Sequence, residues 1–468
     1  AHFYSDMLDY SEMPRWIIVC NFQEFYIYDM ENKQEPPEIL YLKDLPQEYY
    51  RLNFLIDADS TQIQKETAVS LKAGEIVAQL YDLLKQEFIS ANMPITEHVL
   101  TSLNILCVRI VFCLYADSSE LFGRKGMFQD LLKSRNEVGL RETLILLFKV
   151  LNQKQNERDP FLNDDFGAFP YINGGLFQDE NITIPKCGHS VYHLLVEEAT
   201  KNFDWSEISP TVFGSVFENT LNPETRGKGG MHYTSIENIH KVIDPLFLDD
   251  LKDEFRNIKK QTILHEKKQA LLDLQTKIAS LTFLDPACGS GNFLTQTYIS
   301  LRKLENLILE SIHCIDKETN HTTPNLKIKV EIENFHGIEI NDFAVTVAKT
   351  ALWIAELQMM QKTESIMERK ITFFPLKTNA YIHEENALQI DWQDIVPKDK
   401  LHYIIGNPPF LGFSWMTKQQ KQDQSRLTKH KMLDYVACWY YKAAEYIQNT
   451  NIQVAFVSTN SITQGEQV

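Results

Sequence analysis

The sequence predicts an α/β fold around a parallel sheet, preceded by an all-helical region and a short β-rich region. From residue 282 onward, short β-rich runs alternate with long amphipathic helices, which is typical of parallel strands joined by helices. Residues 282–294, TFLDPACGSGNFL, have the pattern of a buried strand, a glycine turn and a helix. Such a unit brings backbone N–H groups and a helix N-terminus against a ligand. We therefore expect a small-molecule site here, with an ordinary βα turn as the alternative.

The composition limits the class of protein. The chain has 468 residues, of which 44% are hydrophobic and 23% charged, and this length leaves room for about three domains of ~150 residues. The net charge of −17 excludes a surface that is basic throughout, so a polyanionic partner would need a locally basic cleft. The seven cysteines are never spaced C-x-x-C. This predicts reduced thiols in the cytoplasm, without a disulfide framework or a metal site.

The N-terminal half is expected to contain a β-rich part and a helical part. Residues 15–30 predict a β-hairpin, and because a lone hairpin is marginally stable, we expect its partner strands upstream. Residues 33–46 have the composition of a proline-bearing linker. Apolar residues then recur at helical spacing from residue 63 to residue 152, which predicts a helical spacer. The turn-rich run 159–188 predicts an ordered surface connection.

The most hydrophobic window, residues 99–115, contains Arg109 and several polar residues. It is too short and too polar to cross a bilayer, so we expect a buried helix and no membrane partner.

The C-terminal half is expected to alternate between helices and strands. The expected helices are residues 236–255, 263–281, 293–311, 342–361 and 435–448, and the expected strands are residues 282–284, 334–340, 403–405 and 453–458. The domain boundaries that follow are residues 1–55, 56–225 and 226–468.

Two polar residues follow predicted strands and are candidates for ligand binding. Glu339 ends the second strand, where a carboxylate can bind two ribose hydroxyls. Its separation from Asp285 is far larger than the ~20 residues of a compact unit, and the polar tract 316–329 accounts for the insertion. A helix N-terminal acid is the alternative. Asn386 can hydrogen-bond the edge of an adenine, although a plain turn is at least as compatible with its stretch.

The run Asn407-Pro408-Pro409-Phe410 follows a buried strand. The two prolines stiffen the loop and remove two N–H donors. The Asn407 side-chain oxygen and the Pro408 carbonyl are then two acceptors on a rigid frame, beside the flat ring of Phe410. This set suits an exocyclic amine on a planar base, which donates two N–H bonds and stacks through one face.

These stretches resemble a known family. Residues 285–293, DPACGSGNF, resemble motif I of S-adenosylmethionine-dependent DNA amino-methyltransferases, and residues 407–410 resemble their motif IV. Residues 230–235, GMHYTS, resemble motif X, and its position ahead of motif I is that of the γ-class adenine-N6 enzymes. More narrowly, residues 15–19, 214–218 and 456–462 resemble the MmeI-like fused restriction–modification enzymes of types IIG and IIL. The resemblance covers most of the chain.

The resemblance implies a class I Rossmann-like methyltransferase that acts as a site-specific, adenine-specific DNA methyltransferase on double-stranded DNA. The implied cofactor is S-adenosylmethionine, and its implied binding residues are Tyr233, Thr234, Asp285, Pro286, Ala287, Gly289, Gly291, Asn292, Phe293, Glu339, Ile340 and Asn386. Glu339 would bind the ribose, Ile340 would pack on the adenine, and Asn386, where many relatives have Asp, would bond its edge. The implied catalytic residues are Asn407, Pro408, Pro409 and Phe410.

The chemistry of adenine indicates how such a pocket would work. The lone pair of its amino group is delocalised into the ring, and accepting both N–H bonds favours a pyramidal nitrogen. Transfer would then be a direct displacement that needs placement more than a strong base. The target base would leave the duplex and stack on Phe410.

A basic run follows the predicted pocket and contains Lys418, Lys421, Arg426, Lys429, His430 and Lys431. It can contact phosphates, and a solvated loop is an equal alternative. Asp434 is expected to be a helix N-cap.

The resemblance also implies parts that this chain would lack. Residues 31–33, Glu-Asn-Lys, match only the last letters of a PD-(D/E)xK nuclease, so we expect the tail of a nuclease domain without its core. We also expect the chain to stop after the fifth strand of the family's sheet, before a target-recognition domain, and the fragment itself to be of doubtful activity. The alternatives are a methyltransferase that acts on RNA or protein glutamine, and a non-catalytic cofactor-binding or DNA-translocation scaffold.

Overall fold

The computed structural model describes residues 16–29, 36–48, 51–52, 58–135, 137–172, 175–200, 203–211, 213–214, 217, 234–319, 327–367, 380–428 and 432–463. The chain divides into two compact units, Ala1–Ala68 and Val69–Val468. Each unit is described by itself.

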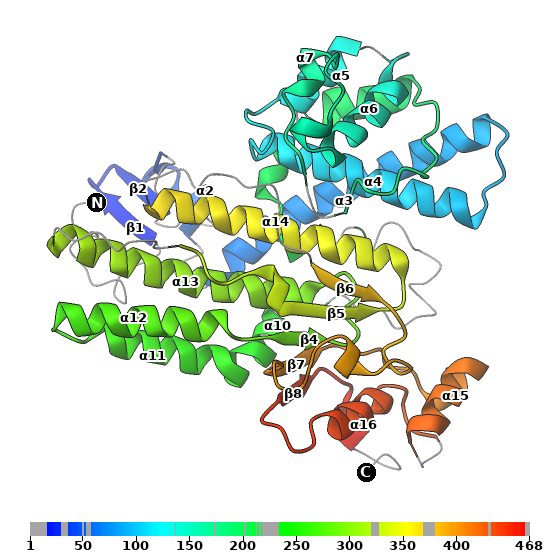
Figure 1. The fold of residues 1–468 in the computed structure, drawn as a ribbon. Helices are drawn as coiled ribbons and strands as arrows, with labels where there is room; N and C mark the ends of the chain where they lie inside the picture. Colours follow the sequence, from blue (N-terminus) through cyan, green and yellow to red (C-terminus); the bar gives the residue numbers. More distant parts are fainter. Residues whose placement is uncertain are drawn as a thin grey trace. The chain divides into compact units, whose positions relative to one another are not determined.

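The first unit contains a three-stranded antiparallel sheet in the order β1-β2-β3, and Figure 1 labels its first two strands. β1 (Trp16–Cys20) and β2 (Glu24–Asp29) form the predicted hairpin. At the turn, the Asn21 side-chain oxygen accepts the N–H groups of Gln23 at 3.0 Å and Glu24 at 2.9 Å. This local bonding is typical of asparagine in turns and explains why the hairpin can be predicted from the sequence.

The prediction for residues 33–46 is wrong. β3 (Glu38–Tyr41) pairs with β2, and the short helix α2 (Leu45–Glu48) follows it. The hairpin therefore has a partner strand downstream of it, while residues 1–15 lie outside the described part of the chain. Ile27 and Leu40 are both buried, and they form a small core between β2 and β3.

The helical region consists of long helices, as predicted. They are α3 (Ala58–Ser90), α4 (Glu97–Ser118), α5 (Met127–Arg135) and α6 (Leu140–Asn152). By length and composition α4 is apolar enough to cross a membrane, but 78% of its hydrophobic window is buried inside the protein. α4 is therefore a core helix, which confirms the buried helix predicted for residues 99–115.

Residues 159–188 connect α6 to the helix that begins at residue 189, as predicted, and most of the described residues in this connection are exposed or half-buried. The structure adds that Phe166, Phe169 and Phe177 of this connection are buried in the main core. The buried Arg109 of α4 holds this segment, because its guanidinium donates to the carbonyls of Leu176 at 2.8 Å and Asp179 at 2.7 Å. Burial lowers the Arg109 pKa to about 10.

Further helices lead toward the sheet. They are α8 (His189–His193) with a π-helical continuation to Ala199, α10 (Ile236–Ile243), a π-helical turn at Asp244–Leu248, α11 (Asp249–Lys259) and α12 (Leu264–Ala279). The predicted helices at residues 236–255 and 263–281 are confirmed, and α11 extends four residues beyond the first of them.

Five described strands form a parallel sheet in the order β6-β5-β4-β7-β8 (Figure 1). They are β4 (Phe283–Asp285), β5 (Phe335–Glu339), β6 (Tyr381–Glu384), β7 (Tyr403–Gly406) and β8 (Gln453–Phe456). β6 was not predicted, because it is a four-residue edge strand with one fully buried side chain, Ile382.

The two faces of the sheet belong to different cores. Phe283 of β4 packs between Phe335 and Tyr403 of the neighbouring strands, with ring centroids 5.1 and 5.4 Å apart. The next residue, Leu284, belongs instead to the cluster that contains Trp392. Successive side chains of a strand point to opposite faces, so these two residues separate the two cores.

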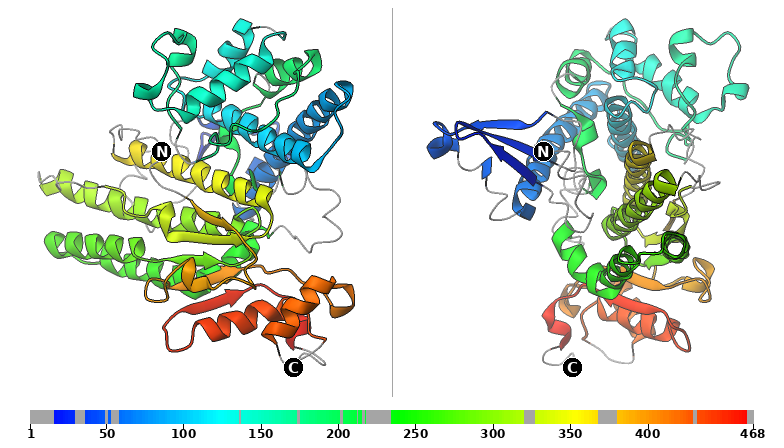
Figure 2. Two further views of the ribbon diagram at one scale, coloured as in Figure 1. Left: turned by 45° about the vertical axis from the view of Figure 1, so that its right-hand side comes forward. Right: turned by 90° about the vertical axis from the view of Figure 1, so that its left-hand side faces the viewer.

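Long helices cover one face of the sheet. α13 (Asn292–Thr319) and α14 (Asp342–Met367) follow β4 and β5, and α12 lies along α13 (Figure 2). α16 (Ala437–Tyr446) contributes Trp439 to the second core, and α15 (Lys418–Leu427) packs beside α16. The helical region is attached to α14, because the Gln361 amide donates to the carbonyl of Ser119 at 2.8 Å.

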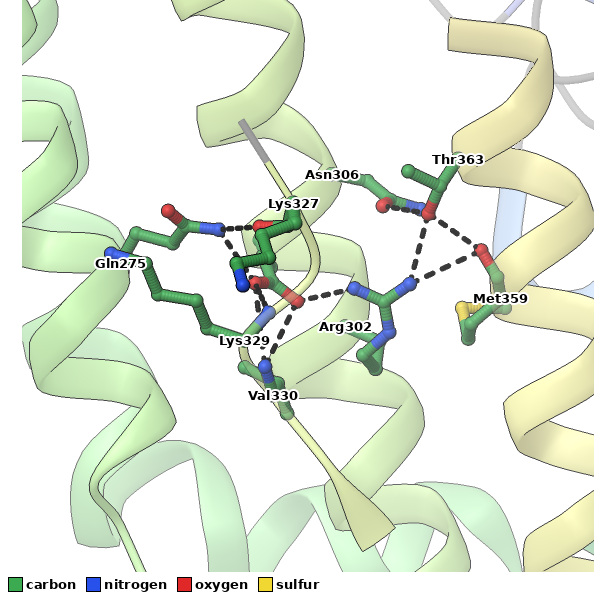
Figure 3. A network of polar contacts seen from close by, with 9 residues as sticks. Gln275, Arg302, Asn306, Lys327, Lys329, Val330, Met359 and Thr363 are labelled. Carbon is green, nitrogen blue, oxygen red and sulfur yellow. Dashed lines mark hydrogen bonds and ion pairs between the residues drawn. The ribbon is translucent and has the colours of Figure 1, made fainter. Parts of the chain in front are cut away.

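A fully buried ion pair on α13 connects this helix to α12 and α14 (Figure 3). Arg302 and Glu305, both on α13, have 0% exposed side chains. Arg302 also donates to Thr363 of α14 at 2.9 Å. Glu305 accepts from Gln275 of α12 at 2.8 Å and from the backbone N–H of Lys329, before β5, at 2.7 Å. The pair therefore connects α12, α13, α14 and the chain that enters the sheet.

We predict that Arg302→Met lowers the free energy of unfolding by about 3–5 kcal/mol, because it leaves the Glu305 carboxylate buried without its cation. Urea denaturation followed by circular dichroism measures the change. The matched control is Arg256→Met, which breaks an exposed pair with Asp253 and should cost at most about 1 kcal/mol. Equal effects of the two substitutions would contradict the prediction.

Candidate functional site

The site lies where the order of the strands reverses. Along the chain, β4, β5 and β6 extend the sheet in one direction, and β7 and β8 extend it on the other side of β4. The carboxyl ends of β5 and β7 therefore flank the end of β4, a position where parallel α/β sheets bind ligands. Asp285, Glu339 and Gly406 are the last residues of these three strands. The fold thus brings the sequence-predicted motifs to one edge.

The two glycines of the turn after β4 have different roles. Both adopt positive φ, +52° at Gly289 and +81° at Gly291, which favours glycine. A Cβ on Gly291 would lie 2.9 Å from the Cβ of Ala348 on α14, whereas a Cβ on Gly289 would meet nothing within 4 Å. Gly291 is therefore required for packing, and Gly289 leaves an open approach to the backbone.

Asp285 is almost completely buried at the end of β4, with 1% of its surface exposed. One carboxyl oxygen accepts the N–H of Ala287 at 3.0 Å. Burial, together with the charge of Glu339, raises the pKa of Asp285 to about 8, although the bond from Ala287 acts in the opposite direction. A Cβ on Gly406 would collide with this carboxyl group, so the end of β7 approaches β4 closely.

Glu339 fixes the end of β5 to the glycine turn. Its Oε1 accepts the N–H groups of Ile340 at 2.8 Å and Asn341 at 2.9 Å, and its Oε2 accepts the N–H of Gly289 at 2.9 Å. The side chain of Ile340 is 69% exposed. An anchored carboxylate and an exposed apolar side chain therefore lie next to each other beside the turn.

The loop after β7 contains an unusual acceptor. Asn407 donates through Nδ2 to the hydroxyl oxygen of Thr234 at 2.9 Å. Its Oδ1 is buried and has no hydrogen-bond partner among the described residues. A buried acceptor without a partner costs about 1–3 kcal/mol, which is typical of a group that binds a donor from outside. Pro408 is buried, and Pro409 and Phe410 are half-buried.

Thr234 therefore meets the predicted catalytic loop directly. Tyr233 and the other residues of the motif X stretch before Thr234 lie outside the described part of the chain. Asn292 and Phe293 begin α13 and are buried. Phe293 belongs to the main core. The Asn292 side chain faces Gly214 instead, since a Cβ on Gly214 would lie 2.9 Å from Asn292 Oδ1.

Two residues that hold the loops were not assigned these contacts from the sequence. α16 begins at Ala437 with Val436 as its N-cap and no side-chain cap bond, so the N-cap prediction for Asp434 is wrong. Asp434 instead accepts the N–H of Val436 at 3.1 Å and the N–H of Leu411 at 3.0 Å. It therefore fixes the backbone directly after Phe410. Trp439 donates through its indole N–H to the Pro286 carbonyl at 3.0 Å. The Asp434–Leu411 and Trp439–Pro286 bonds join residues far apart in the sequence, so no local pattern could reveal them.

Asn386 forms its own local turn and also contacts α15. Its Oδ1 accepts the N–H of Leu388 at 3.0 Å, and its Nδ2 donates to Asp423 at 3.4 Å. Of the predicted basic run, Lys418, Lys421 and Arg426 lie on α15. Residues 429–431 lie outside the described ranges. Within the described ranges, no group of three or more His, Cys, Asp or Glu residues could hold a metal ion.

The topology and the strand-end loops together define a class of protein. A parallel sheet in this order has a glycine turn after its central strand and an Asn-Pro-Pro-Phe loop after the neighbouring strand. This combination defines a Rossmann-like methyltransferase of class I. The predicted fold class, including the preceding helical region, is confirmed.

Comparison with known proteins identifies the family. The family model for the MmeI DNA-methyltransferase domain matches residues 260–468, the MmeI helicase spacer domain matches residues 101–177, and the MmeI N-terminal domain matches residues 1–87. A solved structure of the type IIL restriction–modification enzyme MmeI in complex with DNA is 38% identical, with a TM-score of 0.74. The match covers 84% of this chain and 51% of that one. The chain belongs to the MmeI-like family and carries its DNA-methyltransferase domain.

Curated relatives agree with this assignment. DNA methyltransferase A of Bacillus subtilis (strain 168) is 34% identical over 468 residues, which covers 98% of this chain and 50% of the relative. A putative type II restriction enzyme and methyltransferase of Methanocaldococcus jannaschii is 26% identical over 54% of this chain and 25% of its own length. The chain thus spans half or less of the length of these relatives.

We predict that Gly291→Ala lowers the free energy of unfolding by about 1–3 kcal/mol, because the new Cβ overlaps Ala348 in a crowded interior. The control is Gly412→Ala, where the nearest atom to a new Cβ is 3.8 Å away and the change should stay within about 0.5 kcal/mol. Urea titrations of both variants measure the difference. A Gly291→Ala protein as stable as the control would contradict the role assigned to Gly291.

Proposed function

We propose that this chain is the adenine-N6 DNA methyltransferase module of a fused restriction–modification enzyme and that its methyl donor is S-adenosylmethionine. The observation that carries the proposal is the buried, unpartnered Oδ1 of Asn407, beside the strand ends that carry Asp285 and Glu339. This acceptor needs a ligand that donates an N–H bond. The exocyclic amino group of adenine has two N–H bonds to donate.

The residues present fit the proposed cofactor. Gly289 leaves an open approach to the backbone of the turn, and the buried carboxyl group of Asp285 would pair with a cationic group when ionised. Glu339 is anchored by three backbone N–H bonds, and we propose that the carboxylate held in this way also accepts from a ribose hydroxyl. The exposed Ile340 provides an apolar face for a base. When bound, the cofactor would supply an electrophilic methyl group on a sulfonium.

The residues of this chain would then orient the amine. Asn407 Oδ1 and the Pro408 carbonyl would accept its two N–H bonds, so that the nitrogen lone pair points away from the ring. Thr234 prevents rotation of the Asn407 amide, because its hydroxyl oxygen already accepts from Nδ2. Phe410 would stack on a base that has left the duplex. The neighbouring Lys418 and Lys421 would contact phosphates of the DNA.

The cellular compartment that we propose for this enzyme follows from its family and from its cysteines. All seven cysteines are free, which supports a reducing compartment, the cytoplasm, for the proposed activity.

We predict that Asn407→Ala lowers methyl transfer to duplex DNA by about 100-fold or more, because it removes an acceptor that orients the reacting nitrogen. Cofactor affinity should change by less than about threefold, because Asn407 is proposed to bind the target base. Transfer of a tritiated methyl group in the full-length enzyme, with mass spectrometry of the modified base, measures the effect. Asn451→Ala, at an exposed position, is the control.

The same assay includes RNA and protein as substrates. Exclusive labelling of RNA or protein would contradict the proposed substrate, and unchanged methylation by Asn407→Ala would contradict the proposed pocket.

We also predict that cofactor binding is linked to proton release by Asp285. Between the ordinary carboxyl pKa of 3.8 and about 8, the folded protein holds a proton that the unfolded chain has lost. Stability of the free protein therefore falls as the pH rises through this window. A cationic ligand favours the ionised carboxylate, so affinity should rise from pH 6 to pH 8.

Titration calorimetry at several pH values, in buffers with different ionisation enthalpies, measures this linkage. The control is Asp285→Asn, titrated with the same ligand. Protons released by the ligand itself are then the same in both experiments and can be subtracted. Asp285→Asn should lack the additional proton release. Equal pH profiles for the two proteins would contradict the prediction.

A further inference from the structure

The turn that follows β6 is held by a helix from beyond the catalytic loop. Asn386 begins this turn, and its Oδ1 accepts the N–H of Leu388 at 3.0 Å. The carbonyl of Leu388 accepts from Arg426 of α15 at 2.7 Å. α15 follows β7 in the sequence, whereas the turn precedes it. The contact between them is therefore decided by the tertiary structure.

Asp423 is the centre of this contact. It lies on α15 with only 3% of its surface exposed. Its two carboxyl oxygens accept from the side-chain amides of Asn386 at 3.4 Å and Gln389 at 3.0 Å, and Arg426 lies 3.7 Å away. A buried carboxylate is costly unless it is paired and hydrogen-bonded, and these three partners satisfy that requirement.

The two bonds of Asn386 determine which way its amide faces. A backbone N–H can only donate, so the oxygen of Asn386 must face Leu388. An ionised carboxylate can only accept, so the nitrogen of Asn386 must face Asp423. Both partners therefore require the same orientation. The amide retains one lone pair on Oδ1 and one N–H on Nδ2 for a ligand.

The Asn386 amide lies at the edge of the sheet that carries the proposed cofactor site. β5 and β6 are neighbours, and the N–H of Glu385 donates to the carbonyl of Glu339 at 2.9 Å. The residue after Glu385 therefore lies beside the strand end that carries Glu339 and the exposed Ile340. An amide with one fixed acceptor and one fixed donor can pair with adenine, whose amino group donates and whose adjacent ring nitrogen accepts. Hypoxanthine presents the reverse pattern.

We infer that Asp423 is a positioning residue that fixes the Asn386 amide and thereby selects an adenine over a 6-oxopurine in the cofactor. The inference rests on the proposed function, because it presumes that a nucleoside cofactor binds at these strand ends. Asp423 itself does not touch the ligand, and it acts through Asn386.

The test compares binding of S-adenosyl-L-homocysteine and S-inosyl-L-homocysteine by titration calorimetry. The unmodified protein should bind the adenosyl compound at least about tenfold more tightly, the discrimination typical of a two-bond contact to a base edge. Asp423→Ala should weaken adenosyl binding and reduce the preference at least about threefold. Gln422→Ala, an exposed neighbour on α15, should change neither. An unchanged preference in Asp423→Ala would overturn the inference.

A pair of variants keeps the test decisive if Asp423→Ala does not fold. Asn386→Asp places two carboxylates side by side and should weaken adenosyl binding at least about tenfold. Adding Asp423→Asn exchanges carboxylate and amide between the two positions, so the amide introduced on α15 can donate to the carboxylate introduced in the turn. Binding should then recover at least about threefold, and absence of recovery would overturn the inference.

The two compounds also separate this inference from the proposed function. If the unmodified protein bound neither of them, the proposed function would fail together with the inference. Loss of the Asp423 effect alone would refute the inference and leave the proposed function intact.

Discussion

The buried pair of Arg302 and Glu305 is the interaction on which the methyltransferase sheet depends. Two fully buried charges are tolerated only because each has further hydrogen bonds, and these come from α12, α14 and the chain entering β5. The pair lies on α13, the helix that begins at the glycine turn. Because Gly291 packs against Ala348 of α14, the spacing of these two helices also sets the shape of the turn.

The site combines groups that do not stabilise the fold by themselves. Asp285 is buried with a raised pKa, and Asn407 keeps a buried oxygen without a partner among the described residues. Both features cost stability in the free protein. Under the proposed function this cost is offset on binding, because the proposed ligands would supply a cation and an N–H donor.

Elements that follow the proposed catalytic loop hold the loops on both sides of the candidate site. Asp434 fixes the backbone after Phe410, and Trp439 of α16 holds the turn after β4. Asp423 and Arg426 of α15 hold the turn after β6. α15 also carries the basic residues proposed to contact DNA, so one helix joins the proposed DNA side to the proposed cofactor side. If the proposed function holds, contacts to the target DNA and to the cofactor would therefore depend on the same helix.

The sequence alone determined the parallel α/β fold, the N-terminal hairpin and the strand-end positions of Asp285, Glu339 and Asn407. These depend on local patterns: helical periodicity, turn-forming asparagine and glycine, and residues that directly follow buried strands. Only the tertiary structure decided the pairing of β3 with β2, the edge strand β6, the contact of Arg109 with the carbonyls of Leu176 and Asp179, and the contact of Asp423 with Asn386. Each of these depends on partners distant in sequence, whose proximity is decided by packing and not by local propensity.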